Sequence, residues 1–168
     1  MKKLLLFALT LPFFALAFVT PPQDPPAKKI HWYTWEEMVA ANAKNPKPIF
    51  VDVYTHWCGW CKKMDRSTFQ DPAIVKTLTQ DFYAVKLNAE QKETIHFLGS
   101  DLKYVKNGRS GYHELASALL DDRMSYPTTV LLNSKYERIM ISPGYKNAKK
   151  LMRELKYVTS GEYEEEED

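Results

Sequence analysis

The chain of 168 residues has two cysteines, Cys58 and Cys61, and their spacing is the feature that most directly indicates chemistry. Two thiols separated by two residues can close a disulfide and exchange it with other thiols, without a cofactor. The thiolate is the attacking species, and the positive end of a helix dipole favours its formation. We therefore expect a partly exposed Cys58 to attack and the more buried Cys61 to resolve the mixed disulfide.

The cysteine pair could instead form a structural disulfide or bind a metal. A disulfide that closes so short a loop restrains the unfolded chain weakly, which argues against a purely structural bridge. Cys58, Cys61 and His56 could in principle hold Zn²⁺ or copper, but a closed zinc site takes four ligands and a fourth is not evident. We expect no metal. His56 could also lower the thiol pKa if protonated, although a solvated loop histidine is the favoured interpretation.

The segment before Cys58 is expected to carry it to the start of a helix. Apart from Asp52, residues 49–55 carry apolar side chains on both sides of an extended chain. This pattern predicts a central strand that is covered on both faces. A helix is expected from Cys58 to about Ser67. An acid in such a strand is costly unless it is protonated or paired, and burial raises its pKa.

The other elements alternate between helix and strand. Thr34 and Glu37 form a capping box, Asp71 followed by Pro72 is a helix start, and Asn147 is expected to cap the last helix. Helices are expected at residues 34–43, 71–79, 112–120 and 147–158, and strands at 82–88, 127–132 and 136–141. This order predicts an α/β fold in which a central mixed sheet is flanked by helices on both faces.

Residues 91–111 form an insert before the penultimate helix. Residues 94–98 and 102–105 flank Gly99, which predicts a small added hairpin, followed by a turn at Asn107-Gly108. The insert is expected near the Pro127 side of the domain. It could help to choose substrates, or it could be a neutral surface addition.

The N-terminal region is expected to direct export. Residues 1–17 combine an early pair of lysines, a short apolar stretch and small residues at 15–17, which is the pattern of a cleaved signal peptide. The stretch is shorter than the about 20 residues that a membrane span needs, although a retained anchor is the alternative. Residues 18–29 predict a Pro-rich tether. The domain at 30–158 is therefore expected in the periplasm or otherwise outside the cell.

Charge is distributed unevenly along the chain. Residues 18–160 carry 21 Lys and Arg against 15 Asp and Glu, while residues 161–168 hold six acids. The basic excess is scattered and forms no dense cluster, so nucleic acid is not an expected partner. Residues 159–168 are expected to be an acidic, disordered tail.

The chain resembles the thioredoxin-fold family over about residues 30–158. Four features carry the resemblance, and they occur in the family's order. They are Val51-Asp52 followed by Trp57-Cys58-Gly59-Trp60-Cys61-Lys62, then Val85-Lys86-Leu87-Asn88, then Tyr126-Pro127-Thr128-Thr129, and finally Gly144 before the last helix.

Two segments around the cysteine pair resemble one branch of this family in particular. Residues 54–58 and 68–72 resemble the exported thioredoxin-like branch that includes the C-terminal domain of the electron-relay reductase DsbD. This resemblance implies reduction of protein disulfides outside the cytoplasm. It also implies that a membrane electron-relay reductase supplies the electrons, and we expect a monomer.

The resemblance implies roles for residues around the cysteine pair. Asp52 would move a proton to or from Cys61, with Lys86 as its partner, unless the two form only a structural pair. Pro127 would follow a cis peptide bond and hold the backbone of Tyr126 beside Cys58. The residues expected to contact substrate are Trp57, Gly59, Trp60, Tyr126 and Thr128.

The sequence is compatible with three functions. The first is an exported disulfide reductase that works through Cys58 and Cys61. Trp60 stands where the family more often has proline, and no cation lies between the cysteines to stabilise the thiolate strongly, which favours a reductant. The second is a disulfide oxidase or isomerase. The third is a non-catalytic binding module that uses Trp60 and the basic surface.

Overall fold

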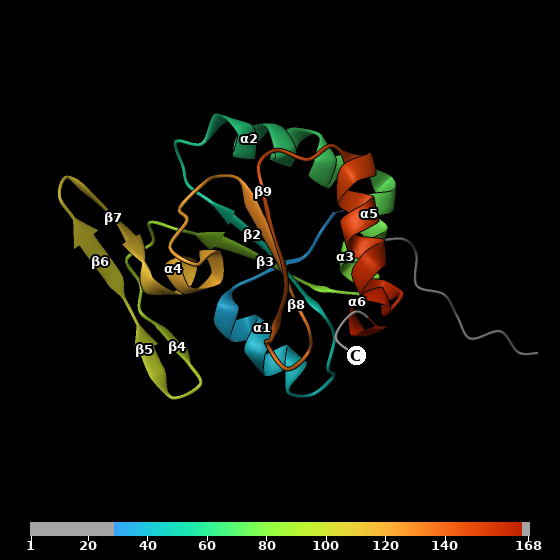
Figure 1. Ribbon diagram of the computed structural model, residues 1–168, viewed down its shortest axis with the longest axis horizontal. Helices are drawn as coiled ribbons and strands as arrows, with labels where there is room; N and C mark the ends of the chain where they lie inside the picture. The colour runs from blue at the N-terminus through green and yellow to red at the C-terminus, as the bar shows by residue number, and fades with distance from the viewer. Residues whose placement is uncertain (1–28, 166–168) are drawn as a thin grey trace, which may run out of the picture.

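Strand β2 (Ile49–Tyr54) is the centre of a five-stranded mixed sheet in the computed structural model, which describes residues 29–165 (Figure 1). It runs parallel to β3 (Tyr83–Asn88) and antiparallel to β8 (Thr128–Leu132). The edges are β1 (Trp32–Tyr33) and β9 (Arg138–Pro143), which gives the order β1-β3-β2-β8-β9. The predicted α/β class with a mixed sheet is confirmed. The predicted signal peptide and nearly all of the tether lie outside the described residues.

Alternation along β2 divides the core into two layers. Val51 and Val53 face a cluster that α1 (Trp35–Asn42) and α4 (Glu114–Leu120) cover. Phe50 faces the opposite cluster, which contains residues of α2 (Gly59–Arg66), η1 (Thr68–Gln70), α3 (Pro72–Gln80) and α5 (Ala148–Thr159). Asp52 alternates with Val51 and Val53, so it lies on the same face as Phe50 and under α2.

Three helix starts follow their predicted caps. Thr34 and Glu37 form the capping box of α1, Asp71 accepts hydrogen bonds from the first turn of α3, and Asn147 caps α5. Each cap satisfies amide groups that have no partner within the helix. The starts of these three helices, one on the α1 face of the sheet and two on the α2 face, are therefore specified by local sequence.

The insert forms two hairpins instead of the single one expected. Strand β4 (Ile95–Phe97) pairs with β5 (Ser100–Leu102), and β6 (Tyr104–Asn107) pairs with β7 (Ser110–His113). The first loop is therefore only two residues, Leu98 and Gly99, both with positive φ. Residues 112 and 113, predicted as the start of a helix, are strand because residues 110–113 pair with residues 104–107 across the second turn. Helix α4 begins only after His113, which caps it.

The C-terminal elements differ from expectation at two places. The strand predicted at 136–141 lies at 138–143, because Asn133 holds a turn and Tyr136 has a positive φ. Residues Glu162–Glu165 form a short helix, α6, so the expected disorder from residue 159 does not hold for them. Within residues 29–165 no helix is both long and apolar enough to cross a bilayer.

Candidate active site

Cys58 and Cys61 are joined by a disulfide at the N-terminus of α2. Cys58 is the N-cap, and its Sγ accepts a hydrogen bond of 3.1 Å from the backbone N–H of Cys61. Its own N–H donates to the carbonyl oxygen of Thr55 at 3.2 Å, which fixes the loop between β2 and the helix. After reduction, the sulfur of Cys58 would stand at the positive end of the helix dipole, where a thiolate is favoured.

The sulfurs and the flanking indoles have opposite exposure. Cys58 is only 4% exposed and Cys61 1%, so the expectation of a partly exposed Cys58 is wrong for this disulfide form. The reason is the N-cap position, which turns the sulfur toward the amides of the first helical turn. Trp57 and Trp60 are instead 66% and 56% exposed. The surface around the disulfide is therefore aromatic, as a surface that meets another protein often is.

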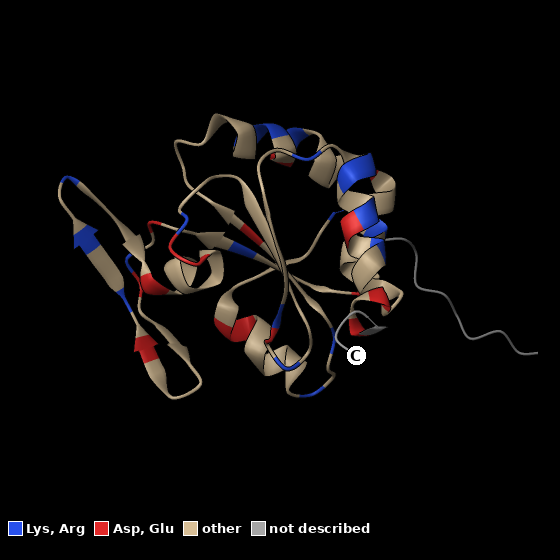
Figure 2. Ribbon diagram, viewed as in Figure 1, with Lys and Arg blue, Asp and Glu red and all other residues tan. Residues whose placement is uncertain are grey.

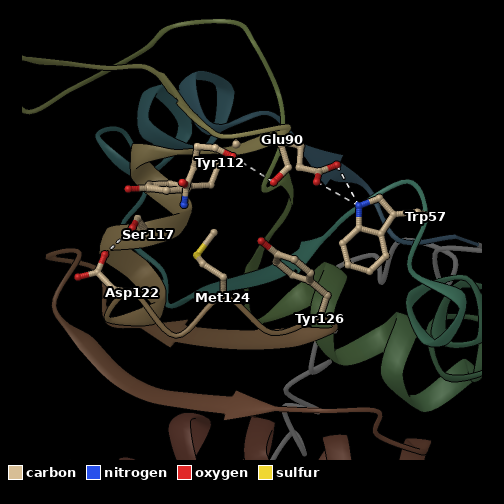
Figure 3. Close-up of a pocket in the computed structure, with 10 residues that line it drawn as sticks. Trp57, Glu90, Tyr112, Ser117, Asp122, Met124 and Tyr126 are labelled. Carbon is tan, nitrogen blue, oxygen red and sulfur yellow. Dashed lines mark hydrogen bonds between the residues drawn. The ribbon is translucent and has the colours of Figure 1, made fainter.

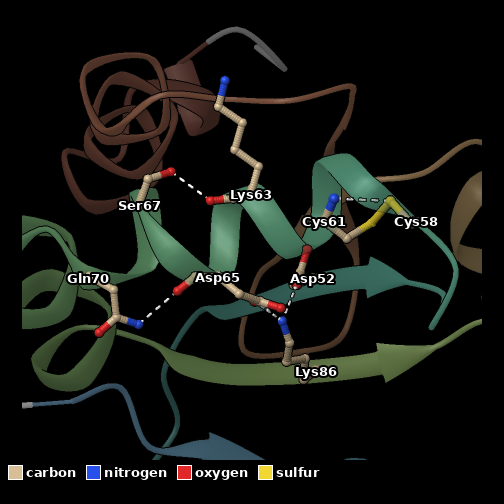
Figure 4. Close-up of polar contacts among 8 residues, drawn as sticks. All are labelled: Asp52, Cys58, Cys61, Lys63, Asp65, Ser67, Gln70 and Lys86. Atoms are coloured by element: carbon tan, nitrogen blue, oxygen red, sulfur yellow. Dashed lines mark hydrogen bonds and ion pairs between the residues drawn. A yellow bond between two sulfur atoms is a disulfide. The ribbon is translucent and has the colours of Figure 1, made fainter.

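An ion-pair network built on the buried Asp52 lies beneath the first turns of α2 (Figure 4). Asp52 is 1% exposed, and its Oδ2 is 3.0 Å from Lys86 Nζ on the neighbouring strand. Lys86 also contacts the carboxylate of Asp65 on α2. Asp65 follows Cys61 by four residues, so the two share a face of the helix. The network therefore joins the sheet to the helix face that carries Cys61.

The electrostatics of this network favour a proton on Asp52. Burial raises the pKa of Asp52, and the nearby Lys86 ammonium only partly opposes that effect. Its Oδ1 is buried without a hydrogen-bond partner among the described residues. For Lys86, burial alone would lower the pKa, but the carboxylates of Asp52 and Asp65 raise it overall. Lys86 therefore stays charged while Asp52 can take up and release a proton.

Asp65 is a residue of this network that sequence reasoning missed. The signal that could have found it is its spacing of four residues from Cys61 on one helix. Nothing in the sequence showed that Lys86 would reach α2, because that contact depends on how the helix crosses the sheet.

The segment before β8 lies at the same end of the sheet as the disulfide. The Tyr126–Pro127 peptide bond is cis, as the resemblance implies, and Thr128 pairs with Val53 near the end of β2. The ring of Tyr126 meets that of Trp57 edge to face at 5.8 Å. Thr128 is buried and donates to the carbonyl oxygen of Ser125 at 2.8 Å, so its side chain is not placed to contact substrate.

The remaining predicted residues flank the disulfide at the surface. Gly59 is exposed with open space around it, and His56 is exposed with its ring 5.7 Å from that of Tyr54. Trp60 packs on Tyr145 at 5.3 Å, and the Lys63 ammonium lies 4.8 Å from the centre of its ring. This cation–π contact holds a positive charge beside the exposed indole.

Lys146 is a fully buried cation near the site, and no sequence pattern indicated it. Its side chain is fully buried, and its Nζ donates to the carbonyl oxygens of Ser142 at 2.5 Å and Gly144 at 3.0 Å. The N–H of Gly144 donates in turn to the carbonyl oxygen of Pro127 at 2.8 Å. Lys146 therefore holds the segment that supports the cis-proline loop.

The buried ammonium of Lys146 gives a prediction about stability and pH. Burial lowers its pKa from 10.5 to about 8. Between these values the unfolded chain binds a proton that the folded chain has lost, so stability should rise with pH. Urea unfolding at pH 8, 9 and 10 should show this rise in the wild type and not in Lys146→Met. The gain in the free energy of unfolding should be at most about 3 kcal/mol. It should be smaller than this bound because the hydrogen bonds to two carbonyl oxygens stabilise the charged ammonium in the folded state. Parallel pH curves for both proteins would contradict the prediction.

Comparison with solved structures shows the thioredoxin fold. A structure described as DsbH oxidoreductase superposes with a TM-score of 0.56 and 14% identity, covering 82% of this chain and 90% of that one. A thioredoxin from Thermus thermophilus gives 0.58 and 19%, covering 79% and 89%. At these identities the likeness establishes the fold alone. It places the Cys58–Cys61 pair in a thioredoxin fold.

Sequence comparison finds relatives that share only a segment with this chain. Uncharacterized protein B0495.5 of Caenorhabditis elegans is 32% identical over 84 residues, which are 49% of this chain and 12% of that protein. Human spermatogenesis-associated protein 20 is 34% identical over 67 residues, 39% of this chain and 8% of that protein. The thiol:disulfide interchange protein DsbD of Pectobacterium atrosepticum is 39% identical over 44 residues, 26% and 8% of the two chains.

A family model covers far more of the chain than any of these pairwise matches. The model named Thioredox_DsbH, described as a protein of unknown function, DUF255, matches residues 22–159. The matched range contains the whole sheet, the disulfide, the buried network and both hairpins. The chain therefore belongs to the Thioredox_DsbH family of thioredoxin-fold proteins.

Proposed function

We propose that this protein is an exported protein-disulfide reductase that acts through Cys58 and Cys61. The observation that carries the proposal is the disulfide at the start of α2, set between two exposed indoles and above a buried carboxylate. A structural bridge would need neither the exposed aromatic surface nor the costly acid beneath it.

The reaction transfers two electrons from the dithiol to a substrate disulfide. The Cys58 thiolate attacks one substrate sulfur, a new sulfur–sulfur bond forms, and the other substrate sulfur leaves and takes up a proton. The Cys61 thiolate then attacks Cys58 Sγ, which closes the Cys58–Cys61 disulfide and releases the second substrate sulfur as a thiolate. The disulfide form described above is the product of this sequence.

Asp52 accepts the proton of Cys61 in the second step. Its raised pKa and its unpaired Oδ1 suit a group that takes up a proton and later releases it. Lys86 and Asp65 hold the carboxylate and the helix in register, so they are positioning residues.

Export, oligomeric state and electron supply form part of the proposal. The pattern in residues 1–17 supports export to the periplasm, and the matched segment of DsbD supports a membrane electron relay as the donor that reduces the disulfide again. The substrates are disulfides of other proteins, and the protein acts as a monomer.

The reduction potential decides the direction of exchange. Equilibration with glutathione, read by tryptophan fluorescence, should give about −200 to −270 mV, the range of glutaredoxins and thioredoxin. A value near −120 mV would make the protein an oxidase. Refolding of a protein with scrambled disulfides separates an isomerase from a reductase. A Cys58→Ser protein that keeps its role in the cell would instead indicate a binding module.

A further inference from the structure

A groove lies beside Trp57, between the second hairpin and the residues that connect α4 to β8 (Figure 3). Its volume is about 610 Å³. Trp57 and Tyr126 form one end, residues 107 and 110–112 of the β6–β7 hairpin form a wall, and Ser117, Asp122 and Met124 lie opposite. We call this space the hairpin groove. Because Trp57 directly precedes Cys58, the groove begins one residue from the attacking cysteine.

The wall on the hairpin side is specified by close packing. Gly111 lies under Tyr104 of the paired strand, and a Cβ at this position would collide with the Tyr104 hydroxyl and the Val105 carbonyl oxygen. The hairpin can therefore adopt this shape only with glycine there. The groove is a consequence of the second hairpin, which the basic sheet-and-helix framework does not require.

The charged side chains that line the groove are acidic. Glu90 and Asp122 contribute carboxylates, and no lysine or arginine lines it among the described residues. The hairpin's own cations, Lys106 and Arg109, are exposed and do not line the groove. Figure 2 shows cations on the β6–β7 hairpin and both acids and a cation on the connection from α4 to β8, where Arg123 follows Asp122 but does not line the groove. A positively charged side chain would be complementary to this lining.

Aromatic rings add a second attraction for a cation. Both carboxylate oxygens of Glu90 lie 3.1 Å from Trp57 Nε1, so a negative charge and an exposed indole lie side by side. The Tyr126 ring adjoins the same indole, and burial, with a smaller effect from Glu90, raises its phenol pKa to about 12. A lysine or arginine in the groove would meet carboxylates and ring faces together.

We propose that the hairpin groove binds a lysine or arginine side chain of the substrate polypeptide, two residues from the cysteine that Cys58 attacks. In an extended chain, residues two apart point to the same side, so a substrate whose cysteine faces Cys58 also directs that residue toward the protein. This inference rests on the proposed reductase function, because it gives part of the same site a role in choosing substrates.

The test uses three symmetric disulfide-linked peptides that differ only two residues before and after the cysteine, where they carry Lys, Ala or Glu. Stopped-flow tryptophan fluorescence of the reduced protein gives the second-order rate constant for each. The Lys peptide should react about 10-fold faster than the Glu peptide, with Ala between them. The preference should fall as salt increases, because the groove is open to solvent.

Variants of the groove acids and of a neighbouring acid test whether the preference for the Lys peptide arises in the hairpin groove. The double variant Glu90→Gln, Asp122→Asn should abolish the preference for the Lys peptide, because both negative charges are gone. The glutamine can still accept the hydrogen bond from Trp57, so the shape of the groove should be kept. Asp121→Asn is the control, since Asp121 bonds Arg138 at 2.9 Å and does not line the groove. Asn is tolerated at both aspartates, which have positive φ. For each protein, the rate constant of the Lys peptide is divided by that of the Ala peptide. A loss of rate that is common to both peptides therefore cancels in the ratio.

Each outcome supports or overturns the inference. Equal rates for the three peptides, or a preference that survives in the double variant, would overturn the groove assignment while leaving the reductase proposal intact. No reduction of any peptide would overturn the reductase proposal instead. In that case the Lys peptide with serine for cysteine still tests the groove. It should shift the NMR signal of the Trp57 indole N–H, which faces Glu90, and an unmoved signal would overturn the assignment.

Discussion

Replacing Cys58 by serine is expected to lower the rate of insulin reduction to that of the chemical donor alone, a loss on the order of 10³-fold. A hydroxyl at this position is not ionised near neutral pH and cannot form the mixed disulfide. The measurement is turbidity of insulin with a fixed concentration of a dithiol donor. The fold should be unaffected, since the disulfide closes too short a loop to stabilise it strongly.

Cys61→Ser is the matched control for this loss. It removes the other sulfur of the same disulfide but leaves Cys58 able to attack, so turnover should also stop while a mixed disulfide with substrate accumulates. Non-reducing electrophoresis followed by mass spectrometry detects that species. If Cys58→Ser traps substrate and Cys61→Ser does not, the assignment of the attacking and resolving sulfurs is reversed.

Asp52→Asn should slow the resolving step by about 10²-fold near pH 7, which is the usual contribution of a positioned general base. The amide fills the same space and still accepts from Lys86, but it cannot take up the proton of Cys61. In the wild type the rate should rise with pH through the raised pKa of Asp52, because only the carboxylate accepts a proton. That rise should be missing in the variant, as stopped-flow decay of the mixed disulfide would show.

The same substitution should raise stability at neutral pH. Because the folded-state pKa of Asp52 is raised, its contribution to stability is present at low pH and is lost as pH rises through that pKa. Asparagine removes the buried charge, so the gain should appear at pH 7 and vanish in acid. Asp65→Asn is the control, because Asp65 is 40% exposed and its effects should be small. A less stable and fully active Asp52→Asn protein would contradict the proton-transfer role.

The framework of the fold was predictable wherever the signal is local. Capping residues at Thr34, Asp71 and Asn147 set three helix starts, and an apolar run identified β2 as a strand buried on both faces. The strand β1 was not predicted, because a strand of two residues is too short to show a periodic pattern. The turn of the second hairpin at Asn107-Gly108 was predicted but its strands were not, because residues 112 and 113 were assigned to the helix that follows and only pairing with residues 104–107 makes residues 110–113 strand.

The candidate site divides in the same way. The cysteine pair, the acid in an apolar strand and the Tyr126–Pro127 dipeptide were visible in the sequence. The roles of Asp65 and Lys146 were not. Asp65 depends on a contact with Lys86 of another element, and Lys146 depends on how the loop after β9 folds so that its ammonium is buried against the carbonyl oxygens of Ser142 and Gly144. Thr128 was expected to contact substrate and instead turns inward, because the pairing register of β8 with β2 sets which way its side chain points.

The sequence by itself determined the chemistry available to this protein, because the spacing of Cys58 and Cys61 and the cap at the helix start are local properties. It also determined the mixed α/β framework, because apolar periodicity requires each face to be buried. Only the tertiary structure decided which charges meet beneath the disulfide and that a second hairpin closes an acidic groove beside it. Those arrangements depend on the packing of a helix across a sheet and on strand pairing at long range, where no short stretch of sequence carries the information.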